Sequence, residues 1–455
     1  MPILEHLSKF LRQDQIKTSS DDILHYGRDW LKIMQPKALA AVFPKSTEEV
    51  AHIVQLCRDH RQGIVVSGGR TGLSGGALAH QNELIVSLEK MNRILGFNEE
   101  DLSVDLEAGV VTEELQNFAK SHSCFFPVDF SSKGSSQIGG NLATNAGGLH
   151  VLRYGNIRNW ATGLEVVTGT GEVLELNRGL MKNATGYDLR HLFIGSEGSL
   201  GIITKATMKL THLPKEKSLF LLGCSSWEKA LKILSRFQKI SNLSAFEVFD
   251  HKCLEKVIQK TDLEQPFAAS QALYILVEIE GIDSSIDDLL DEILKDHLAL
   301  DGIQAQNSQQ FKDLWSYREN ISEAISDAQP YKNDVSVRIS KIPEFISAFE
   351  SLIRKNYSEF EVLWFGHIGD GNLHLNILKP ADWPIEKFQD HCRKVSHLLF
   401  ETLQRLGGSI SAEHGIGLFK KDFLHYSRSE EEIRLMQQIK KVFDPDGILN
   451  PGKIF

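Results

Sequence analysis

Three clusters rich in glycine lie in the first half of the chain, and they constrain its fold more than any other feature. They occupy residues 68–76 (GGRTGLSGG), 139–148 (GGNLATNAGG) and 195–201 (GSEGSLG). Glycine tolerates positive φ and lets the backbone approach a ligand closely, so that successive N–H groups can point at one anion. One such cluster is typical of a tight turn. Three clusters with interleaved Ser, Thr and Asn donors indicate a binding site for a pyrophosphate.

The elements that follow the clusters argue against a nicotinamide-binding fold. In that fold the glycine-rich turn opens a helix, whose N-terminus holds the pyrophosphate. Here residues 68–76 lead into a strand predicted at 84–88, and residues 195–201 lead into a strand predicted at 201–210. The segment 131–148 is dense in Gly, Ser, Asn and Thr and is predicted to contain no regular element. A dinucleotide would therefore be held in another way.

Composition limits the class of protein. The 455 residues correspond to two or three domains, and the formal net charge of −10 argues against a nucleic-acid partner. The five cysteines form no CxxC pair, which favours reduced thiols and excludes a thiolate zinc site. No apolar run approaches the ~18 residues of a membrane span, and the N-terminus lacks a secretory signal. A cytoplasmic location is expected.

Hydrophobic periodicity predicts three parts and an alternation of helices and strands. The parts are a helical lead-in over residues 1–35, a first domain over 36–215 and a second domain over 216–455. The predicted helices are 44–63, 112–120, 227–240, 284–297 and 343–355. The predicted strands are 64–66, 84–88, 102–111, 163–168, 172–176, 201–210, 273–279, 361–366 and 373–378.

A second group of polar residues lies at 361–378 (EVLWFGHIGDGNLHLNIL). Its hydrophobic ends predict two strands joined by a turn, which can bring His367 back beside His374. Because side chains alternate along a strand, His374 and Asn376 share one face. Either histidine alone is explained by a structural role. Two converging imidazoles suggest a metal site, which one carboxylate would complete.

The predicted carboxylate is Glu413, in the segment SISAEHG (409–415). Its neighbour His414 offers a base just outside the metal ligands. Asp370 competes as a ligand, although the chemistry of an Asp-Gly turn explains it without a metal.

The motifs of the first half resemble the FAD-binding domain of the vanillyl-alcohol-oxidase superfamily over about residues 36–215. The resemblance rests on PKSTEEV (44–50), VVSGGRTGLSGG (65–76), PVDF (127–130), SSQIGGNLATNAGG (135–148), RYGNIRNW (153–160) and KNATGYDLRHLFIGSEGSLGIIT (182–204). It implies that residues 67–76 hold the FAD pyrophosphate. The implied FAD-binding residues are Ser67, Gly68, Gly69, Arg70, Thr71, Gly72, Leu73, Ser74, Gly75, Gly76, Pro127, Gly134, Ser135, Ser136, Ile138, Gly139, Gly140, Asn141, Thr144, Asn145, Gly147, Gly148, Asn183, Glu197, Gly198, Gly201, Ile202, Ile203 and Asn450.

Family members that bind FAD covalently through the pyrophosphate loop carry a histidine there. This loop has Arg70 and Thr71 instead, so non-covalent FAD is expected. His80, beyond the second glycine pair, is interpreted as a solvated loop histidine.

The motifs GHIGDGNLHLNI and SAEHGIG resemble the C-terminal domain of the FAD-linked D-2-hydroxyacid dehydrogenases. The resemblance then spans nearly the whole chain, ending at FDPDGILNPGK. It implies that His367, His374 and Glu413 bind zinc or a similar divalent ion and that His414 is the catalytic base and contacts the substrate. Zinc would lower the pKa of the substrate hydroxyl, His414 would take its proton, and hydride would pass to flavin N5.

The same resemblance places Arg318, Ser322, Lys332 and Asn376 at the substrate. Arg318 and Ser322 are four residues apart and are expected on one helix face. The Arg318 guanidinium can bind a carboxylate through two hydrogen bonds, and Lys332 adds a positive charge. Because the metal would already bind the α-carboxylate, these two cations imply a second anionic group on the substrate, which favours D-2-hydroxyglutarate. At position 338 this chain has an arginine where many members of the family have a proline. Arg338 is predicted to share a strand face with Lys332, and either extends the cationic pocket or pairs with Asp334.

The expected fold is therefore α+β: an FAD-binding domain of the vanillyl-alcohol-oxidase and p-cresol-methylhydroxylase (PCMH) type, an α+β substrate domain and a C-terminal helical segment. The expected reaction is oxidation of D-2-hydroxyglutarate to 2-oxoglutarate. D-lactate or another D-2-hydroxyacid, or the role of a glycolate oxidase flavin subunit, is the alternative. A metal-dependent hydrolase and a non-catalytic flavin subunit are weaker classes, because the glycine clusters and both histidines are all present. The family implies an electron-transfer flavoprotein or a quinone as acceptor, and a homodimer.

Overall fold

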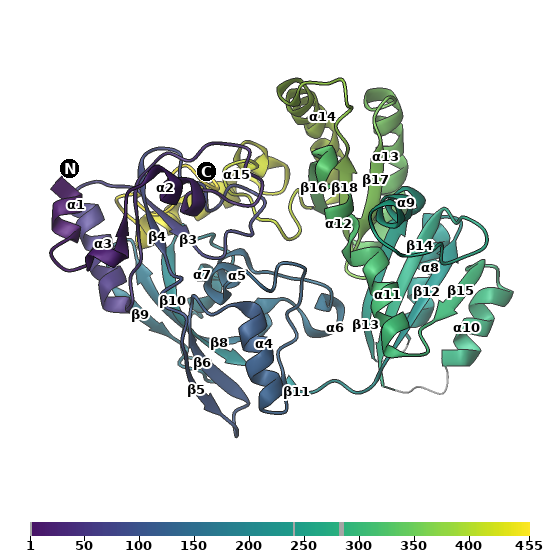
Figure 1. Ribbon diagram of the computed structural model, residues 1–455, viewed down its shortest axis with the longest axis horizontal. Helices are drawn as coiled ribbons and strands as arrows, with labels where there is room; N and C mark the ends of the chain where they lie inside the picture. The colour runs from purple at the N-terminus through teal and green to yellow at the C-terminus, as the bar shows by residue number, and fades with distance from the viewer. Residues whose placement is uncertain (1, 240–241, 282–285) are drawn as a thin grey trace. The chain divides into compact units, whose positions relative to one another are not determined.

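The computed structural model describes residues 2–239, 242–281 and 286–455, which form two compact units (Figure 1). Unit 1 comprises the chain up to Gly148, Gly155–Leu213 and Glu413–Phe455. Unit 2 comprises Leu149–Tyr154 and Pro214–Ala412. Among the described residues, no helix is both long enough and apolar enough to cross a membrane. All five cysteines are free and buried.

The C-terminal segment, expected in the second domain, lies in unit 1. Its backbone continues the pairing of β3 (Ile64–Ser67), because Ile64 N–H donates to Ile448 O at 2.7 Å and Asn450 N–H donates to Ile64 O at 2.8 Å. The segment contains the expected helix, α15 (Glu430–Phe443), which begins at a capping box formed by Ser429.

The first sheet of unit 1 has four strands in the order β1-β2-β4-β3, with β2, β4 and β3 parallel. The strand bounds are β1 (Ile16–Lys17), β2 (Ala38–Val42) and β4 (Glu83–Ser87). The lead-in contributes β1 as well as the helices α1 (Pro2–Leu7) and α2 (Ser20–Tyr26). The predicted helix after Ser46 is α3 (Thr47–Asp59), and the Ser46 side chain accepts from Glu49 N–H.

The second sheet of unit 1 has five antiparallel strands in the order β5-β6-β10-β8-β9. The bounds are β5 (Ile94–Asn98), β6 (Ser103–Glu107), β10 (Gly201–Lys209), β8 (Ala161–Thr168) and β9 (Val173–Leu176). A two-stranded sheet pairs β7 (Cys124–Phe125) with β11 (Thr211–His212), and α4 (Thr112–Ser121) follows β6. The glycine clusters at 68–76 and 195–201 lead into β4 and β10, so neither opens a helix.

The prediction that residues 131–148 contain no regular element is wrong. Helix α5 (Ile138–Thr144) lies in this segment despite its two glycines. Tertiary contacts compensate for the low helix propensity: Ile138 N–H donates to Val110 O at 2.9 Å, and Gly139 N–H donates to Ala108 O at 2.7 Å. The helix ends at Asn145, which adopts a left-handed conformation with φ of 51°.

Unit 2 is built on a seven-stranded antiparallel sheet in the order β15-β12-β14-β13-β17-β18-β16. The strands are β15 (Asp301–Gln304), β12 (Lys217–Cys224), β14 (Leu273–Glu280), β13 (Leu243–Asp250), β17 (Val362–Gly366), β18 (Asn372–Ile377) and β16 (Tyr331–Ser336). The main helices are α8 (Trp227–Phe237), α9 (His251–Lys260), α10 (Ile286–Lys295), α11 (Ser308–Glu319), α13 (Ile342–Asn356) and α14 (Ile385–Leu406). Residues 240, 284 and 285, which belong to predicted helices, lie outside the described residues.

The short segment Leu149–Tyr154, which contains α6 (Val151–Tyr154), is fixed to β14 of unit 2. His150 Nε2 lies 3.1 Å from Glu278 Oε1, and Arg153 Nε donates to Glu280 at 2.9 Å. Tyr154 OH also donates to Glu280, at 2.7 Å. Part of the RYGNIRNW motif therefore serves unit 2, although it is surrounded in sequence by unit 1.

Candidate functional site

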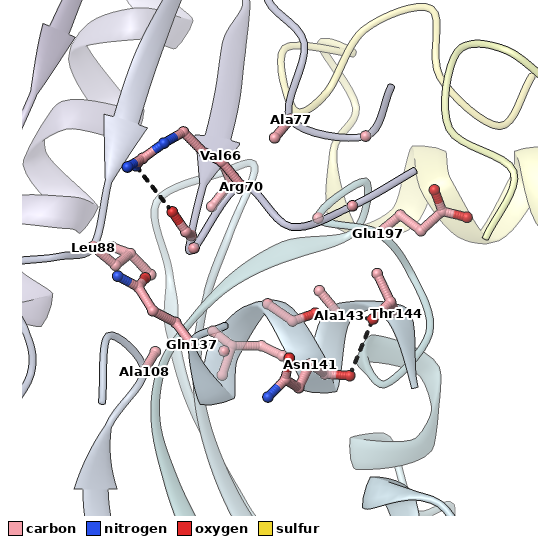
Figure 2. Close-up of a pocket in the computed structure, with 18 of the residues that line it drawn as sticks. Val66, Arg70, Ala77, Leu88, Ala108, Gln137, Asn141, Ala143, Thr144 and Glu197 are labelled. Atoms are coloured by element: carbon pink, nitrogen blue, oxygen red, sulfur yellow. Dashed lines mark hydrogen bonds between the residues drawn. The ribbon is translucent and has the colours of Figure 1, made fainter. Parts of the chain in front are cut away.

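A pocket in unit 1 lies between the glycine loop and α5 (Figure 2). It contains about 950 Å³ of empty space, part of it open to solvent. Predicted residues that line it are Gly68, Gly69, Arg70, Thr71, Gly72, Ser74, Gly76, Gly139, Gly140, Asn141, Thr144, Glu197, Gly198, Gly201, Ile202, Ile203 and Asn450. The predicted base His414 also lines it.

The glycine loop has the features that a pyrophosphate requires. Among the residues that the structure describes, none accepts a hydrogen bond from the backbone N–H groups of residues 69–72. The loop also packs closely on the segment before α5, since a Cβ at Gly69 would lie 2.1 Å from Ser135 O. The Arg70 side chain folds back and donates to Gly68 O at 3.2 Å (Figure 2). Backbone donors of this kind suit an anion such as the pyrophosphate of FAD.

Twelve predicted FAD-binding residues do not line this pocket. Ser67 and Ser136 turn their hydroxyls to protein partners, Tyr26 O and the Thr112 hydroxyl. Asn183 lies in an exposed loop and donates to Asn177 Oδ1 at 3.0 Å. The full set is Ser67, Leu73, Gly75, Pro127, Gly134, Ser135, Ser136, Ile138, Asn145, Gly147, Gly148 and Asn183.

The prediction omitted six residues that line the pocket: Val66, Ala77, Leu88, Ala108, Gln137 and Ala143. Val66, Gln137 and Ala143 are within the quoted motifs and could have been included with them. The others carry apolar side chains without a chemical signature. His80 is also less solvated than predicted, because its Nδ1 lies 3.2 Å from Glu83 Oε1 and its side chain is 13% exposed.

The predicted hairpin in unit 2 is observed, and it brings the two histidines together. The strands β17 and β18 are antiparallel, and the turn 367–371 between them places the rings of His367 and His374 with centroids 5.4 Å apart. The pairing of β16 with β18 sets Asp334 directly opposite His374, and the two side chains approach to 3.6 Å between Oδ1 and Nδ1. Asp334 and His374 thus offer a metal ion two ligand atoms in close proximity.

A buried carboxylate fixes the orientation of His367. Glu247, on β13, accepts a hydrogen bond from His367 Nδ1 at 2.8 Å and lies 2.9 Å from Arg318 Nε. Burial alone would raise the pKa of Glu247, but the charges of His367 and Arg318 outweigh it and lower that pKa. A carboxylate on Nδ1 is the usual partner of a histidine that binds a metal through Nε2.

The expectation that Arg318 and Ser322 share a helix face is wrong. Helix α11 ends at Glu319 and a separate short helix, α12 (Ile321–Ala324), follows. Arg318 is buried against Glu247 and its guanidinium lies 4.9 Å from the centroid of the Phe365 ring, whereas Ser322 is exposed. The expected strand position of Arg338 is also wrong, because β16 ends at Ser336 and Arg338 is exposed.

Lys332 and Asn376 lie directly opposite each other on β16 and β18. They are on the face of the sheet that carries Asp334 and His374, because each pair is two residues from the next. Burial lowers the pKa of Lys332. Asn376 is buried, and within the described part of the chain its Oδ1 atom has no hydrogen-bond partner. A lysine and an amide oxygen without a partner among the described residues therefore lie on the same face of the sheet as Asp334 and His374.

Glu413 and His414 are the first two residues after unit 2. The last residue of that unit, Ala412, donates its backbone N–H to Asp334 O at 3.3 Å. One trans peptide joins Ala412 to Glu413, and their Cα atoms are therefore about 3.8 Å apart.

The comparisons with known proteins identify the family of the chain. Residues 38–177 match the family described as "FAD binding domain", and residues 213–454 match "FAD linked oxidases, C-terminal domain". A D-2-hydroxyglutarate dehydrogenase of Stutzerimonas stutzeri (strain A1501) is 47% identical over 457 residues, which covers 100% of this chain and 98% of that protein. A D-2-hydroxyglutarate dehydrogenase of Xanthomonas citri pv. viticola is 46% identical and covers 97% of this chain and 94% of its own.

The fold has solved counterparts at low sequence identity. A structure of p-cresol methylhydroxylase with bound substrate matches with a TM-score of 0.75 at 16% identity, covering 100% of this chain and 96% of that one. This likeness and the matched domain confirm the predicted PCMH-type α+β fold. The motifs, the two domain matches and the full-length relatives agree, and the chain therefore belongs to the family of FAD-linked D-2-hydroxyacid dehydrogenases.

Proposed function

We propose that the protein oxidises D-2-hydroxyglutarate to 2-oxoglutarate with bound FAD and a divalent metal ion. The observation that carries the proposal is the sheet face of unit 2, where Lys332 and Asn376 lie beside Asp334 and His374. The relatives that are 46–47% identical over nearly their full length are named for this activity, which supports it.

The FAD would be held in the pocket of unit 1 by the backbone donors of residues 69–72. FAD supplies a two-electron acceptor when it is bound there. The loop offers no histidine, so we propose that the cofactor is held without a covalent bond. His414 lines the same pocket and is proposed as the base that takes the proton of the substrate hydroxyl.

The metal would be held by His367, His374 and Glu413, with Asp334 as a further ligand. A zinc or similar ion supplies a Lewis acid that lowers the pKa of the substrate hydroxyl. The protein's own contribution is to fix the donors: the register of β16 and β18 sets Asp334 against His374, and Glu247 holds the ring of His367. The mixed imidazole and carboxylate set suits zinc.

The second carboxylate of the substrate would bind at Lys332 and Asn376. Lys332 bears the burial cost that lowers its pKa, and a carboxylate beside it would offset that cost. The Asn376 amide can present either its oxygen or its NH₂ group by rotation, so it can donate to the same carboxylate. D-lactate has no second carboxylate and would leave both groups without a ligand.

For the electrons we propose an electron-transfer flavoprotein or a quinone as acceptor. A homodimer and a cytoplasmic location stay predictions from the sequence.

A dye-reduction screen of the purified protein against D- and L-2-hydroxyacids, combined with metal analysis, tests the proposed function. We expect D-2-hydroxyglutarate to give the highest kcat/KM, and its L-enantiomer and D-lactate to give much lower values. A higher kcat/KM for D-lactate would favour the alternative substrate. Protein without visible flavin absorbance would contradict the proposal as a whole.

A further inference from the structure

The carboxylate of Glu197 contacts the segment that carries His414. Glu197 lies in the third glycine cluster, directly before β10, and its Oε1 atom accepts from Ile416 N–H at 2.7 Å. Its Oε2 atom accepts from Gly417 N–H at 2.8 Å. In Figure 2 the side chain points away from α5 and toward the C-terminal segment drawn in yellow. Both oxygens of one side chain therefore bind the backbone two and three residues after His414.

The residue between His414 and this contact is shaped to let the carboxylate approach. Gly415 has a φ of +75°, which L side chains rarely adopt. A Cβ at this position would lie 2.8 Å from Glu197 Oε1. The carboxylate therefore packs against the bare backbone immediately beside His414.

Backbone hydrogen bonds with two other parts of unit 1 also hold the segment that follows His414. Leu418 N–H and Phe419 N–H both donate to Ser74 O, at 2.9 and 3.1 Å, and Ser74 belongs to the glycine loop. Ile454 N–H donates to Gly417 O at 3.0 Å. The segment 416–419 is thus fixed between Glu197, the glycine loop and the C-terminus, and His414 lines the pocket beside it.

We propose that Glu197 is a positioning residue for His414. It acts through the backbone of residues 415–417, and so sets where the imidazole stands relative to the pocket. The proposal rests on the proposed function, in which His414 takes the substrate proton. An error of about 1 Å in the position of a catalytic group can cost on the order of 100-fold in rate.

The test compares Glu197→Gln with Glu83→Gln in the FAD-bound protein. Gln is nearly isosteric with Glu but replaces one acceptor oxygen by a donor that opposes a backbone N–H. Glu83 is a matched control, because its carboxylate also accepts two backbone N–H groups, those of His80 and Gln81, and is buried. Its two donors, His80 and Gln81, are not part of the segment 414–419.

Two measurements are made on each variant. The first is amide hydrogen exchange over residues 414–419, which we expect to be about tenfold faster in Glu197→Gln and unchanged in Glu83→Gln. The second is the rate of flavin reduction by D-2-hydroxyglutarate, which we expect to fall about 10- to 100-fold in Glu197→Gln with little change in KM or FAD content. Unchanged exchange in Glu197→Gln would overturn the proposal.

A double-mutant cycle decides whether Glu197 acts through His414. We expect His414→Ala to be slow, and His414→Ala combined with Glu197→Gln to be no slower. If Glu197→Gln has the same effect in both backgrounds, Glu197 acts on the flavin and the proposal is wrong. If Glu197→Gln loses FAD, Glu197→Asp, which keeps the charge but retracts the oxygens, is measured in the same way. A wild-type protein whose flavin no 2-hydroxyacid reduces would contradict the proposed function, whereas the exchange measurement would still report on the contact.

Discussion

At the scale of single residues, Glu247 forms an ion pair with Arg318, which bears on whether Arg318 or Lys332 is the cation proposed to bind the substrate. The side chain is buried between His367 and Arg318, and its ion pair with Arg318 measures 2.9 Å. Breaking a buried pair by removing one partner costs about 3–5 kcal/mol, because the other charge is left without compensation. Arg318 is therefore already paired with Glu247, and we propose Lys332 as the group that binds the second carboxylate of the substrate.

Replacing Lys332 with Met tests this assignment. We expect KM for D-2-hydroxyglutarate to rise by about 10- to 100-fold, because a hydrogen bond to a charged group contributes about 1.5–3 kcal/mol. The kinetic constants for D-lactate should change little, since lactate has no group for Lys332. Steady-state dye reduction with both acids measures the difference.

The control is Lys355→Met, a substitution of an exposed lysine on α13 that should alter neither substrate. Equal losses for D-2-hydroxyglutarate and D-lactate in Lys332→Met would show that Lys332 does not read the second carboxylate.

At the scale of elements, a buried charge on β14 joins four parts of unit 2. Glu278 accepts hydrogen bonds from Lys217 at 2.8 Å, Ser244 at 2.8 Å and Trp315 Nε1 at 3.0 Å, and lies 3.1 Å from His150 Nε2. Burial opposes the charge, but His150 and Lys217 outweigh it and lower the pKa of Glu278 to about 2. These contacts connect β12, β13, α11 and the segment 149–154 to the central strand.

The lowered pKa predicts an acid dependence of stability. A carboxyl group with a depressed pKa in the folded state stabilises that state above its unfolded pKa and loses the effect as pH falls through the folded value. Between pH 4.5 and 2 the contribution of Glu278 should decline by about 3 kcal/mol, at 1.36 kcal/mol per pH unit. Glu278→Gln lacks this contribution at every pH. The difference in free energy of unfolding between wild type and Glu278→Gln should therefore become smaller as the pH falls over the same range.

Hydrogen exchange of the β14 amides provides the measurement, because it reports on unit 2 without requiring the whole chain to unfold in one step. Thr261→Val, a substitution of a half-buried hydroxyl after α9, is the control and should show a constant deficit with pH. A constant deficit in Glu278→Gln as well would contradict the assigned pKa.

Elements with strong local signals were predictable from the sequence, and those held by distant contacts were not. The hairpin 362–377 follows from two apolar runs and an Asp-Gly turn, and it correctly brought His367 to His374. Helix α5 has poor local propensity and depends on backbone contacts with Ala108 and Val110. The position of Asp334 opposite His374 depends on the register of β16 with β18, which no local pattern in either strand specifies.

At the scale of the whole molecule, the chain passes between the two units several times, and the proposed site residues Glu413 and His414 directly follow one of these passages. The segment 149–154 follows the second glycine cluster and serves unit 2. At residues 412 and 413 the chain passes from unit 2 back to unit 1. The segment 409–412, which is hydrogen-bonded to β16, is there followed directly by the segment that carries His414. One stretch of backbone thereby connects the proposed metal ligands of unit 2 to the pocket of unit 1.

Metal removal tests the role of the ligand set. Prolonged chelation should lower turnover of D-2-hydroxyglutarate by about 100-fold or more, since a Lewis acid contributes several kcal/mol to such a step. Flavin absorbance should persist, because the pocket proposed to hold FAD is lined by groups other than the proposed metal ligands. Added zinc should restore activity, and full activity in protein shown to be metal-free would exclude the proposed role.

The most direct test of the central claim is anaerobic mixing of the metal-loaded wild-type protein with D-2-hydroxyglutarate, followed by the visible absorbance of bound flavin. We expect rapid bleaching, formation of one 2-oxoglutarate per flavin, and little bleaching with the L-enantiomer. Flavin that stays oxidised with D-2-hydroxyglutarate but is bleached by a different 2-hydroxyacid would contradict the assigned substrate. Flavin that no 2-hydroxyacid reduces would contradict the assigned reaction.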